Sequence, residues 1–279
     1  MNFDPKQYWE ERLKSLCNLE GVGCAGRTKA WNAFLYKSKV RTMNRALSKL
    51  GLDIRGYKAL DIGTGVGFWI DYLLGKGVDS IIGIDIAPSS IELCKKKYSN
   101  LKNLKFVCGD ISNDIFVSEL GGYDLATLAT AFDVLYHITD DDKFCAAIKN
   151  NIAYALNPGG YLFLTDILSP SGDKISHQQH VRWRSLSYYE QELDNNRLDI
   201  VYLAPMTVLL GSPIDAGGLL GKILNVIYYG LTVRLTSKSK TFPGIESAYL
   251  TVLYTFDSFL ASFSRFGVLT KLLVAKKRG

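Results

Sequence analysis

Three glycines stand close together behind an acidic residue in the stretch ALDIGTGVGFWID, which occupies residues 59–71. Asp61 ends a short apolar run that predicts a buried strand, and Gly63, Gly65 and Gly67 follow it. Because glycine has no Cβ, such a loop turns sharply and lets its backbone approach a ligand. The helix expected after the loop presents free N–H groups, which suit a carboxylate or other polarised oxygen.

The spacing of these glycines excludes two common phosphate-binding loops. The dinucleotide fingerprint is G-x-G-x-x-G, whereas this loop is G-x-G-x-G with Phe68 at the place of the third fingerprint glycine. A P-loop would end in Gly-Lys-Ser/Thr, which is absent here. A nicotinamide-dependent dehydrogenase is therefore disfavoured.

Two further acids end the next two predicted strands. Asp85 closes the run SIIGID, and Asp110 follows LKFVCG. At the carboxyl edge of an open α/β sheet, where ligands bind, Asp85 can accept hydrogen bonds from both ribose hydroxyls. Asp110 can accept one from an adenine amino group, with Ile86 and Ile111 on the ring faces. The pattern thus favours a nucleoside-containing ligand.

The elements that position these residues alternate between strand and helix. Short apolar runs near residues 57–62, 80–86, 104–111, 123–130 and 161–168 predict five strands, with amphipathic helices between them. This alternation predicts an α/β fold whose core is a parallel sheet covered on both faces, and runs at 198–205 and 268–277 complete a Rossmann-like seven-stranded sheet. We expect an N-terminal helical lid at 1–55, a core at 56–205, a helical cap inserted at 206–267 and a final core strand at 268–279.

Composition limits the remaining possibilities. The chain has 279 residues, 47% hydrophobic, and a net charge of +6 without the basic stripe of a nucleic-acid binder, so no nucleic-acid partner is expected. Its five cysteines form no C-x-x-C pair, which favours free thiols in a reducing compartment. An N-terminus without an apolar signal and the absence of a long apolar run predict a cytoplasmic protein. Contact with a membrane surface stays open, as does the choice between monomer and homodimer.

Five motifs together resemble the class I S-adenosylmethionine-dependent methyltransferases. They are ALDIGTGVGF, IIGIDIAPSSIELCKKK, LKFVCGDI, YDLATLATAFDVLYHI and LNPGGYLFLTDIL, in the order and spacing of that family, and they cover residues 56–168. The resemblance implies S-adenosylmethionine as cofactor and S-adenosylhomocysteine as product. It also implies cofactor-binding roles for these residues: Asp61, Gly63, Gly65 and Gly67 at the methionine part, Asp85 and Ile86 at the ribose, Asp110 and Ile111 at the adenine, and Ala131 and Phe132 closing over the methionine end.

The segment AFDVLYHITDDDKF after the fourth strand is expected to border the methyl acceptor. His137 can take a hydroxyl proton, while Tyr136 and Asp133 can orient the acceptor. The alternative is that His137 only packs in its loop. The acidic run at 140–142 suggests the metal site of catechol-type enzymes, but a capping box of Thr139 and Asp142 at a helix N-terminus explains it better, and no metal is expected.

Two other segments supply candidate substrate-binding residues. In HVRWRSLSYYEQEL an extended backbone would place Arg182 and Arg184 on one side, where they could hold a carboxylate or phosphate of the substrate, with Tyr188 nearby. The alternative is that both arginines are only surface charges beside a helix. In GRTKAWNAFLYKSKVR the candidate substrate-binding residues are Trp31, Asn32 and Tyr36. If this segment folds over the cofactor as a lid, Arg41 could pair with the methionine carboxylate. The alternative to a lid is an aromatic helix face docked on the sheet.

The sequence therefore predicts a methyltransferase acting on a small molecule, at oxygen rather than nitrogen, in a natural-product, quinone or cell-surface sugar pathway. No Asn/Asp-Pro-Pro-Tyr loop of amino-group nucleic-acid methylators follows the fourth strand. Carboxyl methylation of a peptide-derived or small carboxylate metabolite is the alternative acceptor chemistry. A binding protein that has lost catalysis is the alternative from another class. For the apolar cap we rank an acceptor-pocket wall first, then dimerisation, then membrane contact.

Overall fold

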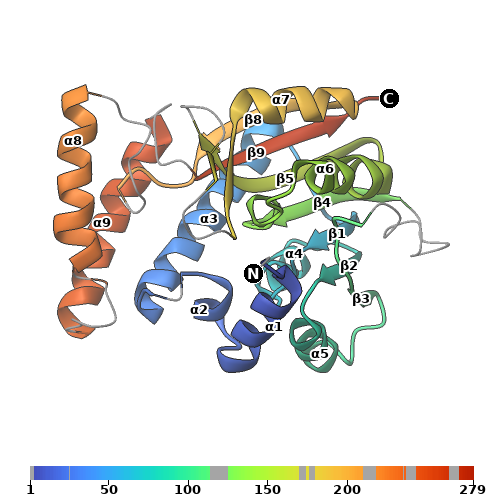
Figure 1. Cartoon of the computed structure of the whole chain (residues 1–279), viewed down its shortest axis with the longest axis horizontal. Helices are drawn as coiled ribbons and strands as arrows, with labels where there is room; N and C mark the ends of the chain where they lie inside the picture. The colour runs from blue at the N-terminus through green and yellow to red at the C-terminus, as the bar shows by residue number, and fades with distance from the viewer. Residues whose placement is uncertain are drawn as a thin grey trace.

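The computed structural model describes residues 3–24, 26–113, 125–169, 174–175, 180–209, 218–234, 236, 243–263 and 270–279. Its centre is a nine-stranded sheet with helices on both faces (Figure 1). The strand order is β3-β2-β1-β4-β5-β7-β6, while β9 pairs with β5 and β8 pairs with β9. The predicted α/β, Rossmann-like architecture is confirmed.

Five parallel strands form the half of the sheet that carries the glycine loop. They are β1 (Lys58–Ile62), β2 (Ser80–Asp85), β3 (Leu104–Cys108), β4 (Ala126–Phe132) and β5 (Leu156–Ser169). In register, Asp61 lies beside Gly83 of β2 and Thr130 of β4. The carboxyl ends of β1, β2 and β4 therefore meet at one edge, as the sequence predicts.

The two strands predicted near the end of the chain complete the sheet. Strand β9 (Thr270–Lys277) runs antiparallel between β5 and β8 (Leu198–Pro205). An antiparallel pair begins and ends at the same edge, so the segment between β8 and β9 can leave and re-enter the sheet at one end. The two short strands β6 (Lys174–Ile175) and β7 (Arg182–Ser185) extend the sheet beyond β5 and were not predicted.

Helices cover the two faces in separate groups. On one face α3 (Lys29–Leu50), α4 (Phe68–Gly75) and α5 (Pro88–Lys97) share a core with Ala59, Leu128 and Phe163 of the strands. On the other face α6 (Asp141–Ala146), the π-helical η3 (Ala147–Ala153) and α7 (Leu186–Asn195) pack on Leu162 and Leu164. Neighbouring residues of β5 thus point to opposite cores, the alternation expected of a strand buried on both faces.

Two short helices precede α3 along the chain. Helix α1 (Pro5–Ser15) and α2 (Leu19–Val22) begin at Asp4 and Asn18, whose side chains accept hydrogen bonds from the first free backbone N–H groups. Figure 1 shows both helices beside the carboxyl ends of β1 and β2. This position is where a lid over the site would lie.

The cap segment forms α8 (Gly218–Ile227), η4 (Tyr228–Val233) and α9 (Pro243–Phe263) between β8 and β9. It lies at one end of the molecule, where α9 packs along α3 (Figure 1). Within the described helices none is long and apolar enough to cross a membrane. All five cysteines are free thiols.

The acidic run at 140–142 caps a helix, but through a different residue from the one predicted. Asp140 is the N-cap of α6 and accepts a hydrogen bond from the Lys143 backbone N–H at 3.0 Å. Thr139 is therefore not the N-cap. In the part of the chain that the structure describes, no group of three or more His, Cys, Asp or Glu side chains is arranged to hold a metal ion.

Candidate functional site

A cavity of about 520 Å³ opens at the carboxyl edge of the parallel strands. One side is built by the strand ends and the loops after them, including Ile62–Val66, Ile84–Ile86, Gly109–Ser112 and Phe132–Val134. The other side is built by the N-terminal helices through Phe3, Pro5, Trp9, Leu13, Val22 and Tyr36, and by the segment His137–Asp140. Strand ends and N-terminal helices together thus enclose a single space.

The glycine loop after β1 forms the floor at the centre of this cavity. Gly63 and Gly65 line the cavity, and both have a left-handed backbone, with φ of 73° and 55°. A Cβ on Gly63 would lie 2.2 Å from Cγ2 of Val134, so no larger residue fits without movement. Gly67 is the N-cap of α4 and does not line the cavity; its carbonyl accepts a hydrogen bond from the Tyr98 hydroxyl at 2.8 Å. Its contribution is to the turn, because a non-glycine residue is strained at its φ of 76°.

Asp85 ties the loop after β2 to the glycine loop while facing the cavity. Its Oδ2 accepts a hydrogen bond from the Gly65 N–H at 2.7 Å, and Oδ1 accepts one from the Ala87 N–H at 2.9 Å. Burial raises the pKa of this carboxyl. Each carboxylate oxygen keeps a second acceptor position, which is the requirement for binding the two hydroxyls of a ribose.

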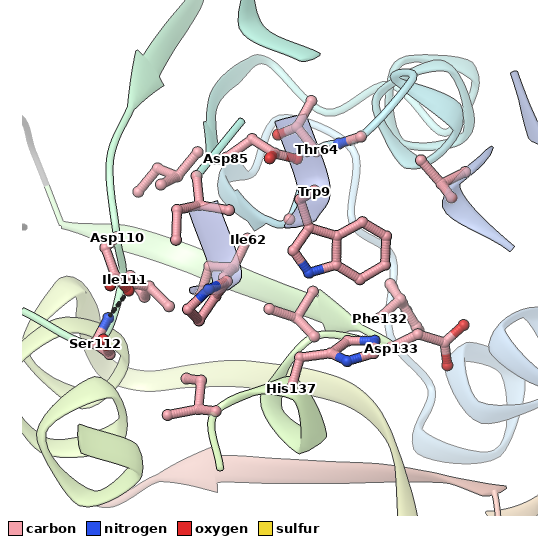
Figure 2. A pocket seen from close by; sticks show the side chains of 18 of the residues that line it. Trp9, Ile62, Thr64, Asp85, Asp110, Ile111, Ser112, Phe132, Asp133 and His137 are labelled. Carbon is pink, nitrogen blue, oxygen red and sulfur yellow. Dashed lines mark hydrogen bonds between the residues drawn. The ribbon is translucent and has the colours of Figure 1, made fainter. Parts of the chain in front are cut away.

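Asp110, Ile111 and Ile86 line the cavity beside Asp85, as predicted. The Asp110 Oδ1 accepts a hydrogen bond from the Ser112 N–H at 2.8 Å (dashed line in Figure 2). The buried Asn151 donates through Nδ2 to the backbone carbonyl of Ile111 at 2.6 Å and so fixes this loop. An acid beside two isoleucines suits a flat heterocycle that carries an amino group.

Asp61 lies below the glycine loop and does not line the cavity. Its Oδ1 accepts a hydrogen bond from Thr130 Oγ1 at 2.6 Å, and burial raises its pKa to about 7. Its buried Oδ2 has no hydrogen-bond partner in the structure. A buried carboxylate oxygen without a donor is costly, and an ammonium group brought to the glycine loop would satisfy it.

His137 lies at the end of the cavity away from Asp110, with the Trp9 indole next to its ring (Figure 2). Its Nδ1 is 2.9 Å from the backbone carbonyl of His180. A carbonyl only accepts, so Nδ1 carries the hydrogen and Nε2 of the neutral ring keeps its lone pair. Burial lowers the pKa of His137 to about 4, although the bond to His180 opposes this. The imidazole is therefore neutral at pH 7.

Asp133 also reaches the cavity and is held by an unpredicted partner, Lys39 of α3. The two side chains form an ion pair, and Thr165 Oγ1 donates to Asp133 Oδ1 at 2.8 Å. Burial alone lowers the Lys39 pKa, but the Asp133 charge outweighs it, so the pKa lies above its ordinary value. The Lys39 ammonium also lies 4.4 Å from the ring centre of Tyr36, a cavity residue that the sequence predicted. Lys39 could not be singled out because nothing in its helical pattern marks it as buried.

Phe132 and Trp9 of α1 line the cavity near His137. Phe132 lines the cavity and stacks on Trp69 at 3.9 Å between ring centres. Trp9 meets the His137 ring edge to face at 4.9 Å. Ala131 is buried in the core on the α6 side and does not reach the cavity. Trp9 was missed because one tryptophan on a charged helix has no distinctive spacing.

Several predicted substrate residues lie outside the cavity lining. Arg182 and Arg184 do share a side, but both bind Asp141, with Arg184 Nη2 2.9 Å from its Oδ1. Arg184 is fully buried and also donates to the carbonyl of Ile138 at 2.8 Å. The two arginines therefore bind the carboxylate of Asp141, whereas the sequence predicted that they would hold a group of the substrate. Tyr188 packs beside Arg184 and Phe144, and Tyr136 is not among the lining residues either.

The predicted residues early in α3 serve the contact between α3 and the rest of the fold. Trp31 packs on Leu250 and Leu253 of α9. Asn32 is buried and binds the backbone of Cys24 on both sides of its amide. Arg41 donates to the Met206 carbonyl at 3.0 Å and pairs with Asp257 at 3.2 Å. These three residues thus contact the cap or the segment before α3, and none of them lines the cavity. No described residue of the cap lines the cavity, contrary to the use ranked first for it.

Comparison with known proteins agrees with this geometry. A family model described as a methyltransferase domain matches residues 34–202. The chain belongs to this methyltransferase family. The model spans the parallel strands, the glycine loop and His137, so the predicted class I S-adenosylmethionine-dependent family is confirmed.

Individual relatives share the core and differ in what they act on. The chain is 29% identical to an mRNA cap guanine-N(7) methyltransferase of Candida glabrata over 56% of this chain and 41% of that one. It is 26% identical to a ubiquinone biosynthesis O-methyltransferase of Neisseria meningitidis over 41% of this chain and 46% of that one. The chain therefore matches less than half the length of these relatives. Magnesium protoporphyrin IX methyltransferase from Synechocystis, solved with S-adenosylmethionine bound, has the same fold, with a TM-score of 0.55, 14% identity and coverage of 99% and 98%.

Proposed function

We propose that the protein transfers a methyl group from S-adenosylmethionine to an oxygen atom of a small molecule. The observation that carries this proposal is one continuous cavity with Asp85 and Asp110 at one end and a neutral histidine at the other. A natural-product, quinone or cell-surface sugar pathway provides acceptors of this kind, and the ubiquinone relative is named as an O-methyltransferase.

The residues at the strand ends fit the cofactor. Asp85 offers two acceptor positions for the ribose hydroxyls, and Asp110 with Ile111 suits the adenine. The cradle of Gly63 and Gly65 admits a close backbone contact, and the unpartnered Oδ2 of Asp61 suits an ammonium group. When bound, S-adenosylmethionine supplies a sulfonium methyl group that needs no further activation.

The chain's own task is then to align the acceptor and receive its proton. As the acceptor oxygen gains the methyl group, its O–H bond becomes strongly acidic and the proton moves to His137 Nε2. Such a proton is released even to a weak base, so a pKa of about 4 suffices. The bond from His137 Nδ1 to the His180 carbonyl holds the required tautomer. Asp133, held by Lys39 and Thr165, provides an acceptor for a second hydroxyl.

The aromatic wall supports exclusion of water from the transfer. Trp9 contacts His137, and Phe132 and Tyr36 add apolar surface on the adjoining sides. A dry site strengthens the electrostatic interaction between the acceptor oxygen and the positively charged donor. Apolar, aromatic acceptors with one or two hydroxyls fit this lining best.

The alternative acceptor chemistry loses its structural support. Carboxyl methylation rested on Arg182 and Arg184, and both of these guanidinium groups are paired with Asp141. A protein that only binds the cofactor is disfavoured by the cavity continuing past the glycine loop to His137 and Asp133.

A radiolabelled methyl-transfer assay tests the proposal. The protein is incubated with methyl-labelled S-adenosylmethionine and three acceptor sets: phenolic and hydroxylated small molecules, small carboxylates, and capped RNA. We expect label in the hydroxyl set and a loss of about 100-fold or more in rate for His137→Gln. Unchanged S-adenosylmethionine affinity in that variant shows that its cofactor site is intact. Transfer to capped RNA alone, or full activity of His137→Gln, would refute the proposal.

A further inference from the structure

Helix α9 carries apolar side chains on two opposite faces. One face packs inward through Leu250, Leu253 and the buried Ala261. The other carries Ile245, Val252, Phe256 and Phe259, which are 60–65% exposed, together with the exposed Ala248. We call these five residues the outer stripe. Their spacing of three or four residues places them on one side of the helix.

The neighbouring helices expose side chains of the same kind. On α8 and η4, Leu219, Ile223, Val226 and Tyr229 are 48–75% exposed. Figure 1 shows α8 and α9 together at the end of the molecule farthest from β3. The Thr232 hydroxyl of η4 lies 3.3 Å from the Tyr249 hydroxyl of α9, so the two exposed sets belong to one packed unit. Soluble surfaces rarely carry this many large exposed apolar residues without a binding partner.

The charges of this region favour one kind of partner. Among the described residues of α8, η4 and α9 and the residue after η4, the exposed charged side chains are Lys222 and Arg234, both cationic. The two acids, Glu246 and Asp257, are buried; Glu246 accepts a hydrogen bond from Thr28, and Asp257 pairs with Arg41 and accepts from the Val208 N–H. The outward face of the region is therefore apolar and basic, without an exposed acid among its described residues.

We propose that α8, η4 and α9 form a docking surface for a lipid bilayer with anionic headgroups. Exposed Phe, Ile and Val side chains enter the interface between headgroups and acyl chains, and Lys222 and Arg234 meet the negative surface. The buried acids allow this approach, because an exposed carboxylate would be repelled. This inference concerns a different face from the cavity and does not depend on the acceptor or on methyl transfer.

Vesicle co-sedimentation of the full chain tests the surface. Vesicles of phosphatidylcholine mixed with phosphatidylglycerol are compared with vesicles of phosphatidylcholine alone at low salt. One variant carries Val252→Ser, Phe256→Ser and Phe259→Ser; its matched control carries Leu101→Ser, Tyr154→Ser and Val201→Ser, exposed apolar residues on other parts of the fold. A third variant reverses two charges with Lys222→Glu and Arg234→Glu. Circular dichroism and S-adenosylmethionine affinity verify that each variant is folded.

We expect the native chain and the control variant to bind the anionic vesicles. The outer-stripe variant is expected to lose about tenfold or more in vesicle affinity, and the charge variant about tenfold. The proposal is overturned if the native chain does not sediment with anionic vesicles, or if the outer-stripe variant binds as well as its control. It is also overturned if sedimentation equilibrium shows a dimer that only the outer-stripe variant dissociates, since the face is then an interface between copies of this chain.

Discussion

Replacing Asp85 with asparagine is the most informative single change at the cofactor end of the cavity. The carboxylate already accepts hydrogen bonds from the Gly65 and Ala87 N–H groups, one on each oxygen. Each oxygen keeps one further acceptor position, which we assign to one ribose hydroxyl. Asparagine retains a single acceptor oxygen, so one ribose hydroxyl can no longer donate to this side chain, and the Gly65 or the Ala87 N–H faces an NH₂ group instead.

The expected loss follows from the strength of one hydrogen bond to a charged acceptor. Such a bond contributes about 1.5–3 kcal/mol, which corresponds to a rise of about 10- to 150-fold in the Kd for S-adenosylmethionine. Isothermal titration calorimetry measures this directly. A matched control is Asp79→Asn, an exposed acid just before β2 at the opposite end of the same strand, which is expected to change Kd by less than about twofold. An Asp85→Asn protein that is folded and binds with native affinity would refute the ribose assignment.

Four further predictions concern stability and the acceptor end. Gly63→Ala places a Cβ against Val134 on a residue with a left-handed backbone, and should lower the free energy of unfolding by about 2 kcal/mol. Gly75→Ala, which has open space around it, should not lower this free energy. Urea denaturation compares the two variants. Lys39→Met leaves the Asp133 carboxylate without its cation and should lower the free energy of unfolding by about 3 kcal/mol. The double variant with Asp133→Asn should recover part of this loss. Full additivity of the two changes would contradict a direct ion pair. The methyl-transfer rate should stay level from pH 8 to about 5.5 and fall through pH 4 as His137 gains a proton; a fall centred near pH 6.5 would contradict the buried, neutral imidazole. The pKa of Asp61 in the folded protein, about 7, lies above its value in the unfolded chain, so ionisation of Asp61 lowers the free energy of unfolding as the pH rises. Between pH 5 and 8 the native chain should lose about 2–3 kcal/mol of stability that the Asp61→Asn variant keeps. Identical pH dependence of the two proteins in thermal melts would count against this account.

The strand-end half of the cavity was predictable because strand order determines which loops meet at one edge of the sheet. Glycines after the first strand and acids after the second and third meet at one edge in any parallel sheet of this kind. The structure brings Gly63, Gly65, Asp85 and Asp110 to one cavity accordingly. These contacts depend on short loops directly after strands, where local sequence determines position.

The other half of the cavity, around His137 and Asp133, was less predictable because it depends on contacts between distant segments. Arg182 and Arg184 face the same way, as their alternation indicates, but the sequence does not show that Asp141 lies opposite them. Trp9 reaches the cavity, and Lys39 reaches Asp133 at its edge, only through the packing of the N-terminal helices, which no spacing rule determines. The same holds for Arg41, whose partner Asp257 is more than two hundred residues away.

A crystal structure of the protein with S-adenosylhomocysteine tests the central claim most directly. We predict that the product lies in the cavity with its ribose hydroxyls on Asp85, its adenine between Asp110 and Ile111, and its amino acid end at Gly63 and Gly65. Its sulfur should face the space beside His137. A product bound elsewhere, or bound with the ribose away from Asp85, would contradict the account.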